Sequence, residues 1–81
     1  MVTPKRVLLC DESIHLLRAA EFKLHAAGYH VETAHDGQEA WERIEISIPD
    51  LLVTDCQMPR LDGLQLTQRI RRRPEMQGLP I

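Results

Sequence analysis

The hydrophobic positions of the chain fall into three short runs separated by longer stretches with helical spacing. The short runs, residues 7–10, 30–34 and 51–53, predict strands. The first and third are apolar throughout, which is typical of strands buried on both faces of a parallel sheet. The middle run alternates polar and apolar residues, which favours an edge strand with one face in water.

The first stretch with helical spacing, residues 14–27, predicts a helix that begins after Ser13 and ends before Gly28. Serine is a favoured N-cap, and glycine readily takes the left-handed conformation that closes a helix. A stripe with spacings of three and four is expected to face the core: Leu16, Ala20, Leu24 and Ala27. Three apolar residues fall partly off this stripe and are expected to lie against another helix: Ile14, Leu17 and Phe22.

Two further helices are expected. Asp36 and Glu39 have the spacing of a capping box, which would open a helix reaching about residue 44. Its inward-facing residues are Ala40, Trp41 and Ile44. After Gly63, a third helix is predicted to end by about residue 73, before Pro74, and its pattern is carried by Leu64, Leu66, Thr67 and Ile70. Residues 79–81 have the character of the beginning of another strand.

Alternating strands and helices predict an α/β fold with parallel strands and right-handed crossovers. The two apolar strands belong in the middle, with the alternating strand outside the first, which gives the order 2-1-3. Asp11, Glu12 and Asp55 then follow neighbouring strands at one end of the sheet, where ligands bind in such folds. Asp55 could equally cap the turn that follows it, and all three acids could do no more than cap helix starts.

Acidic side chains at this end would crowd one another, because parallel strands lie about 4.8 Å apart. Crowded carboxylates repel unless a cation or a proton intervenes. Oxygen ligands from a few protein groups suit Mg²⁺, and a loop carbonyl after Asp55 could complete the protein's share. Such a site can host phosphoryl transfer to a carboxylate.

Composition narrows the classes of protein. The 81 residues suffice for one small domain, and the net charge of −2 gives no strong field toward nucleic acid or membrane. No apolar run approaches the roughly 18 residues of a membrane span, and the N-terminus lacks the order of a signal peptide. Cys10 and Cys56 do not make a secreted disulfide framework and are expected to be buried free thiols. A cytoplasmic location is therefore predicted.

The histidines and a cluster of arginines are both expected at the surface. The four histidines lack the spacing of metal ligands: His15, His25, His30 and His35. Four arginines near the end of the third helix suit its dipole and are expected to be solvated: Arg69, Arg71, Arg72 and Arg73. A nucleic-acid patch is disfavoured there because the whole chain is acidic.

The sequence around the predicted site resembles the receiver domain of two-component response regulators. Residues 7–13, 27–29 and 34–40 match the family, as does Asp-x-x-Met-Pro-x-x-Asp-Gly at residues 55–63. The resemblance spans essentially the whole chain and implies a flavodoxin-like parallel sheet with helices on both faces. It also implies that Asp55 is the phosphoacceptor and that Mg²⁺ is held by Asp55, the acidic pair Asp11 and Glu12, and the backbone carbonyl of Gln57.

The resemblance implies a signalling module and not an enzyme, one that takes a phosphoryl group from a partner histidine kinase or phosphotransfer protein. A full receiver has two further strand–helix units, which supply a hydroxyl residue and a lysine without counterparts in these 81 residues. We therefore expect residues 1–81 to be a receiver domain incomplete at the carboxyl end, stopping at the stub of a fourth strand. A homodimer through the exposed sheet edge or the first helix is a further expectation.

Two other functions stay open at this point. One is a pseudo-receiver, which binds partner proteins without taking phosphate. The other is a Mg²⁺-dependent phosphohydrolase or a Toprim-like nuclease site, which also gathers acids at strand ends. Such sites typically carry an Asp-x-Asp pair after a strand, and the presence of Gln57 at the second position counts against them.

Overall fold

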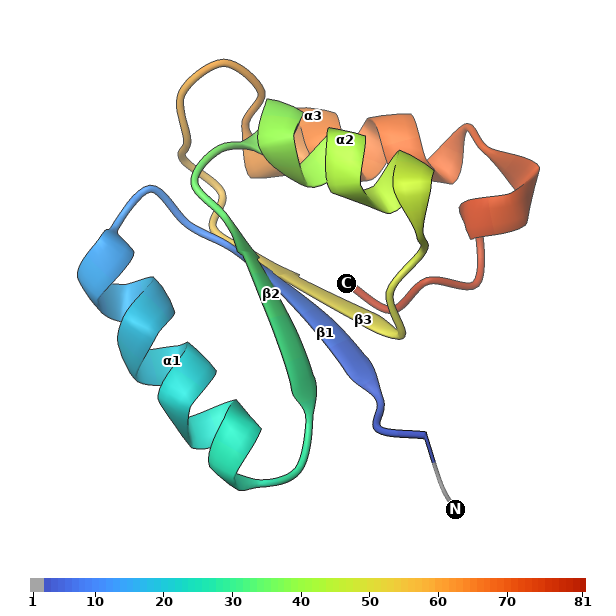
Figure 1. Ribbon diagram of the computed structural model, residues 1–81. Coiled ribbons are helices and arrows are strands. Elements are labelled where there is room, and N and C mark those ends of the chain that lie inside the picture. The colour runs from blue at the N-terminus through green and yellow to red at the C-terminus, as the bar shows by residue number, and fades with distance from the viewer. Residues whose placement is uncertain (1–2) are drawn as a thin grey trace.

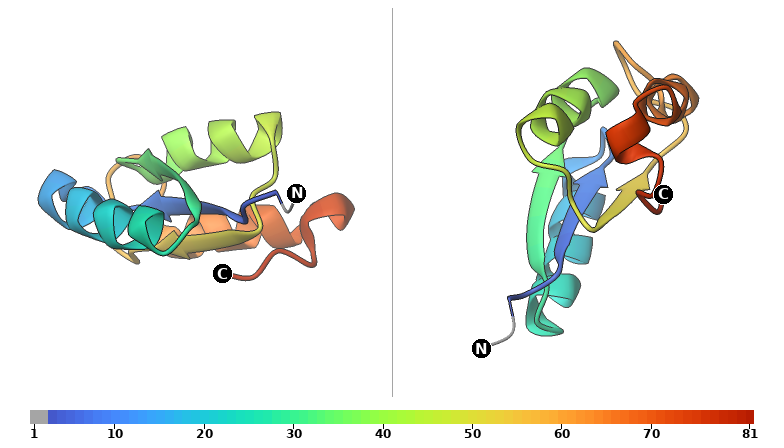
Figure 2. Two further views of the ribbon diagram at one scale, coloured as in Figure 1. Left: turned by 60° about the horizontal axis from the view of Figure 1, so that its bottom comes forward. Right: turned by 90° about the vertical axis from the view of Figure 1, so that its right-hand side faces the viewer.

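The computed structural model describes residues 3–81 as one parallel sheet with helices on both faces (Figure 1). The strands β1 (Arg6–Cys10), β2 (His30–Ala34) and β3 (Leu51–Thr54) lie in the order β2-β1-β3. Helix α1 (Ile14–Ala26) covers one face, and helices α2 (Gly37–Ile46) and α3 (Gly63–Arg71) cover the other (Figure 2). The predicted α/β class and strand order are confirmed. Within residues 3–81, no helix has the length and apolar character needed to cross a membrane.

The register brings the carboxyl ends of β1 and β3 side by side. Cys10 pairs with Thr54, and the Asp55 amide donates to the Cys10 carbonyl at 2.9 Å. On the other side, the Asp11 amide donates to the Ala34 carbonyl of β2 at 3.1 Å. Asp11 and Asp55 therefore leave the sheet from adjacent strands at the same end, as the strand pattern predicts.

The core between the sheet and the two helices α2 and α3 is the larger of two cores. Its largest fully buried side chains are Leu8, Ile44, Leu52, Leu66 and Ile70. Trp41 of α2 belongs to this core and is only 6% exposed. The guanidinium groups of Arg69 and Arg73 lie over its ring, 5.5 and 5.1 Å from the centroid. These two arginines, predicted to be solvated, are only partly exposed, because they also cover an aromatic ring.

The core beneath α1 is smaller and corrects the prediction for that helix. Leu17 packs on Val7 and Leu9 and is 3% exposed, whereas Leu16, which was expected in the core, is 62% exposed. Both residues 17, 20 and 24 and residues 16, 20 and 24 have the three- and four-residue spacing of one helix face. Periodicity alone therefore could not decide whether Leu16 or Leu17 is buried. The expectation that Ile14 and Phe22 lie against another helix was also wrong, since both are exposed.

The start and end of α1 follow the predicted capping. Ser13 Oγ accepts a hydrogen bond from the Leu16 amide at 3.3 Å. The helix ends at Ala26, and Gly28 follows with φ +100°, in the left-handed region where glycine has no Cβ penalty.

The capping boxes differ from the prediction. The Asp36 carboxylate accepts from the Glu39 amide at 2.8 Å, but the Glu39 carboxylate turns to the backbone amide of His35 at 3.2 Å. The predicted box is therefore only half formed. A complete box opens α3, where Asp62 and Gln65 each accept from the other's backbone amide, at 2.8 and 3.0 Å.

The segment after α3 returns along β3. Helix α3 ends at Arg71, two residues before the predicted end, and the 3₁₀ turn η1 (Pro74–Met76) follows. Arg71 is exposed, as predicted, and its guanidinium also donates to the carbonyl oxygens of Met76, Gln77 and Leu79. Residues 79–81 form no strand, but the Leu52 amide donates to the Pro80 carbonyl at 3.0 Å.

Candidate functional site

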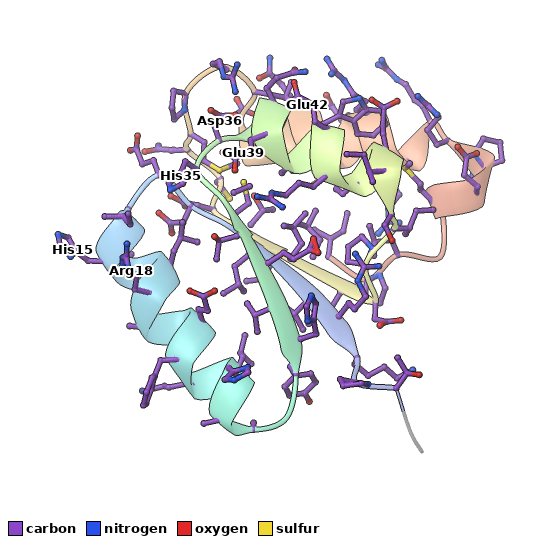
Figure 3. All side chains as sticks on the ribbon, in the orientation of Figure 1. His15, Arg18, His35, Asp36, Glu39 and Glu42 are labelled. Atoms are coloured by element: carbon purple, nitrogen blue, oxygen red, sulfur yellow. The ribbon has the colours of Figure 1, made fainter. Side chains whose placement is uncertain are left out.

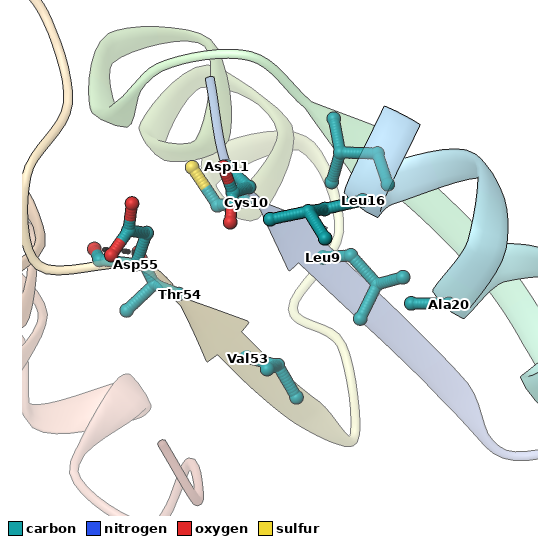
Figure 4. A pocket seen from close by; sticks show the side chains of 9 residues that line it. Leu9, Cys10, Asp11, Leu16, Ala20, Val53, Thr54 and Asp55 are labelled. Atoms are coloured by element: carbon teal, nitrogen blue, oxygen red, sulfur yellow. Dashed lines mark hydrogen bonds between the residues drawn. The ribbon is translucent and has the colours of Figure 1, made fainter. Parts of the chain in front are cut away.

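A pocket of about 300 Å³ opens beside the carboxyl ends of β1 and β3. Figure 4 shows Asp11 and Asp55 at its polar end, while Leu16, Ala20 and Val53 line the part between α1 and the sheet. The pocket lies on the α1 side of the sheet, where the core is small. Two of the acidic residues predicted to form the site, Asp11 and Asp55, thus line the same cavity.

Asp55 is exposed, and local bonds hold it in place. Its Oδ1 accepts from the Cys56 amide at 2.8 Å, and the Thr54 hydroxyl donates to its backbone carbonyl at 2.9 Å. The loop then folds back so closely that any Cβ at Gly63 would overlap the Asp55 carbonyl. The glycine that ends the motif is therefore required by this close approach.

The other predicted ligands lie in different settings. Asp11 is half-buried, and its Oδ1 accepts from the Ser13 amide at 2.9 Å, so it also serves the turn before α1. Glu12 is exposed and does not line the pocket, and Gln57 lies exposed in the loop after Asp55. Within residues 3–81, no three His, Cys, Asp or Glu side chains are grouped so that they could hold a metal ion. The four-residue ligand set stays a prediction.

The donors that do line the pocket fit the chemistry of Mg²⁺. In the described part of the chain, Oδ2 of Asp11 and Oδ2 of Asp55 accept no hydrogen bond. Mg²⁺ is usually held by one or two carboxylates and several waters. The pair Asp11 and Asp55 supplies ligands of this kind.

Sulfur contacts anchor the loop after Asp55 from inside. Cys10 Sγ lies 3.1 Å from Met58 Sδ and 3.3 Å from the Asp36 carbonyl oxygen. Burial raises the pKa of Cys10 to about 12, so its thiol stays protonated at neutral pH and acts as a donor. Cys10 is buried as predicted, but Cys56 is exposed, because β3 ends at Thr54 and position 56 falls in the loop.

An ion pair anchors the same loop from outside. Arg60 Nε donates to Asp36 Oδ2 and Arg60 Nη2 donates to Asp36 Oδ1, both at 3.0 Å. The hydrogen bonds from Arg60, and next those from the Glu39 amide, lower the pKa of Asp36. The sequence predicts Asp36 only as a helix cap, and nothing local signals that a residue 24 positions away would reach it.

The histidines occupy the surface, as predicted. All four are exposed, and two of them approach acids: His30 Nε2 lies 3.8 Å from Glu32 Oε2, and His35 Nδ1 lies 3.3 Å from Glu39 Oε2. Figure 3 shows His35, Asp36 and Glu39 gathered where β2 leads into α2. This corner is a charged surface that borders the loop after Asp55.

Comparison with known proteins places these features in context. Residues 7–81 match the family described as the response regulator receiver domain. The transcriptional regulatory protein TrcR of Mycobacterium tuberculosis is 44% identical over 85% of this chain and 27% of its own length. The phosphate regulon regulatory protein PhoB of Rhizobium meliloti is 38% identical over 96% of this chain and 34% of its own length. The chain thus spans about a third or less of these two relatives.

Solved structures show the same architecture. The chemotaxis response regulator CheY4 of Vibrio cholerae superposes with a TM-score of 0.94 at 33% identity, covering 98% of this chain and 66% of that one. A putative response regulator of Chloroflexus aurantiacus gives 0.94 at 35% identity, over 98% and 65%. TrrA of Thermotoga maritima, in complex with Mg²⁺-BeF, gives 0.82 at 30% identity, over 88% and 62%.

Proposed function

This chain belongs to the response regulator receiver domain family, and on that premise we propose that it accepts a phosphoryl group on Asp55. The observation that carries the proposal is the position of Asp55. It is exposed at the carboxyl end of β3, it shares a pocket with Asp11, and it begins the Asp-x-x-Met-Pro-x-x-Asp-Gly pattern. Receiver domains of response regulators interact with histidine kinases or phosphotransfer proteins, so the proposed donor is a phosphohistidine on such a partner.

The transfer asks little covalent chemistry of the protein. A carboxylate oxygen of Asp55 attacks the phosphorus atom, the new P–O bond makes an acyl phosphate, and the P–N bond of the phosphohistidine breaks. The leaving imidazole nitrogen keeps the electron pair and takes a proton from solvent. Positioning of the carboxylate and stabilisation of charge therefore supply most of the catalysis. The hydrogen bond from the Cys56 amide to Oδ1 fixes the orientation of the Asp55 carboxylate at the end of β3.

The proposed ligands of Mg²⁺ are Asp11, Glu12, Asp55 and the backbone carbonyl of Gln57. When bound, Mg²⁺ supplies positive charge against the phosphoryl oxygens. The relative TrrA, solved with Mg²⁺-BeF, supports the proposal. A ligand that binds only the folded state raises its stability by about 2.7 kcal/mol at a hundredfold excess over Kd. Millimolar Mg²⁺ should therefore raise the melting temperature, Glu12→Gln should blunt that rise, and an unchanged curve would refute a metal site.

Labelling with acetyl phosphate tests the phosphoacceptor. In the full-length protein with Mg²⁺, Asp55→Asn should abolish labelling. Asp62→Asn is a matched control in the same loop, because asparagine keeps the oxygen that caps α3. Labelling that persists in the Asp55→Asn variant and maps to Asp11 or Glu12 would overturn the assignment. A wild type that takes no label would instead favour the pseudo-receiver.

Self-association through β3 remains a prediction. Val53 on this strand is 48% exposed, and Ile81 beside it is 43% exposed. A sheet edge with apolar side chains is a template for pairing with another chain. Light scattering after size-exclusion chromatography should report a mass twice that of one chain, and a monomer at all concentrations would exclude the pairing.

A further inference from the structure

The backbone of Arg60 has a conformation that arginine rarely adopts. Its φ is +66°, and it is the one non-glycine residue among 3–81 with a positive φ. In this region Cβ crowds the following carbonyl, so an L-residue stays there only when its surroundings hold it. The group that holds Arg60 is the carboxylate of Asp36, through two hydrogen bonds. The strained residue therefore marks a loop whose shape is imposed by a charged pair.

The rest of the loop at residues 56–62 is unevenly restrained. Its second half is fixed on α2: the Leu61 side chain is buried, and its carbonyl lies so close to Gly37 that any Cβ there would overlap it. A single internal backbone bond, from the Leu61 amide to the Pro59 carbonyl at 2.8 Å, stiffens that half. The first half, which contains Gln57, is tied to the start of α3 by the bond from the Gly63 amide to the Cys56 carbonyl at 3.0 Å. Beyond that bond it is held by the contacts that Met58 and Arg60 make outside the loop.

Asp36 is suited to organise this region because it binds three segments at once. Its carboxylate caps α2 through the Glu39 amide and accepts the fork from Arg60. Its backbone carbonyl lies 3.3 Å from the thiol of Cys10 at the end of β1. An arginine–carboxylate pair with two parallel bonds fixes orientation as well as distance. The loop after β3 is thereby set in register with β1 and α2.

We propose that Arg60 and Asp36 are positioning residues for phosphoryl transfer to Asp55. The inference rests on the proposed function, because it concerns the loop whose Gln57 carbonyl is the proposed Mg²⁺ ligand. Neither residue lines the pocket, so both act through the loop. The pair holds the loop in one shape before the metal and the phosphoryl donor arrive, which leaves less ordering to be done on binding.

Four variants of the full-length protein test the proposal by the Mg²⁺ dependence of acetyl phosphate labelling. Arg60→Ala and Arg60→Lys remove the fork, the second while keeping the charge. Arg60→Gly removes the guanidinium but suits the left-handed backbone. Asp36→Asn keeps the oxygen that caps α2 and loses the charge. Each should need about tenfold more Mg²⁺ for half-maximal labelling, the lower end of the effect of residues that orient metal ligands.

A control and a double variant separate positioning from general stability. Arg73→Ala removes another arginine–carboxylate pair of α2, at 2.8 Å from Glu45 near the opposite end of that helix. It should lower the melting temperature at least as much as Asp36→Asn while leaving the Mg²⁺ dependence at the wild-type value. The double variant Arg60→Ala/Asp36→Asn should need no more Mg²⁺ for half-maximal labelling than either single variant, because the two residues act as one pair.

The outcomes are distinct. Wild-type Mg²⁺ dependence in Asp36→Asn would overturn the inference, because the charged pair would then not be needed. Wild-type behaviour of Arg60→Gly alone would overturn it too, because the backbone conformation would then suffice without the pair. Failure of the proposed function looks different, since the wild type itself would then carry no label on Asp55.

Discussion

The two faces of the sheet differ in how completely helices cover them. Leu52 and Val53 are successive residues of β3, yet Leu52, under α2 and α3, is fully buried, whereas Val53, on the α1 side, is 48% exposed. A fully buried side chain of this kind contributes about 1.5–3 kcal/mol relative to an exposed one. The α2–α3 face therefore carries most of the folding energy, and the α1 face keeps room for the pocket.

The loop after Asp55 belongs to both faces. Met58 and Leu61 attach it to the core under α2 and α3, while Asp55 itself opens into the pocket on the other side. Functional groups are commonly carried on loops that a rigid scaffold positions. In this molecule the well-packed face is the scaffold, and the open face is where a ligand can approach.

The largest expected loss of stability comes from Leu52→Ala on the α2–α3 face. The change removes a fully buried side chain from the α2–α3 core and leaves a cavity, which typically costs about 2–5 kcal/mol. Urea denaturation followed by circular dichroism should show that loss in the free energy of unfolding. A loss below about 1 kcal/mol would mean that the well-packed face is not the main source of stability.

The second-largest difference is expected between the N-caps of α3 and α1, measured as the stability lost when each cap is removed. Asp62→Ala breaks the complete capping box of α3 and should cost about 1–2 kcal/mol. Ser13→Ala removes a single 3.3 Å bond at α1 and should cost about 0.5 kcal/mol. The same denaturation experiment measures both, and equal losses would contradict the asymmetry.

The Arg60–Asp36 pair, beside the well-packed face, should add a pH-dependent contribution. The pKa of Asp36 is lowered in the folded protein by Arg60 and then by the Glu39 amide, so the charged form stabilises the fold. This contribution is complete above the unfolded value of about 3.9 and disappears as pH falls through the lower folded value. The destabilisation by Asp36→Asn should therefore be full at pH 7 and shrink below about pH 4. A difference that stays constant with pH would contradict the assignment.

The smallest effect is expected from Val53→Ala on the open face. Half of this side chain is already in water, and substitutions at such surface positions usually change stability by about 0.5 kcal/mol or less. Paired with Leu52→Ala, this variant compares the two faces at adjacent positions of one strand. A loss as large as that of Leu52→Ala would show that a partner covers the open face in solution.

Much of the fold could be predicted from the sequence because its strands are strongly patterned. Two apolar runs and one alternating run fixed the strand order, and the order placed Asp11 and Asp55 together. The rotation of α1 could not be predicted, because Leu16 and Leu17 both extend a helical stripe and only Val7 and Leu9 decide which one is buried. The capping box at Asp36 failed for a local reason, since the His35 amide takes the Glu39 carboxylate.

The candidate site could be predicted only as far as its local signals reach. The motif at residues 55–63 identifies the loop and the glycine that closes it, because both requirements are contained in nine consecutive residues. The pair formed by Arg60 and Asp36 depends on how β3 and α2 are placed in space, and the sequence pattern carries no trace of it. The exposure of Cys56 likewise follows from the exact end of β3.

The burial of Trp41 beneath Arg69 and Arg73 gives this protein a built-in optical reporter. It is the chain's single tryptophan, it belongs to α2, and it does not line the pocket. Its fluorescence emission therefore reports the packing of α2 against α3 and not the presence of an ion beside Asp55. A spectral shift on addition of a phosphoryl donor would mean that a structural change at Asp55 reaches the packing of α2 and α3 on the other face of the sheet. A constant spectrum would mean that any change is confined to the α1 side.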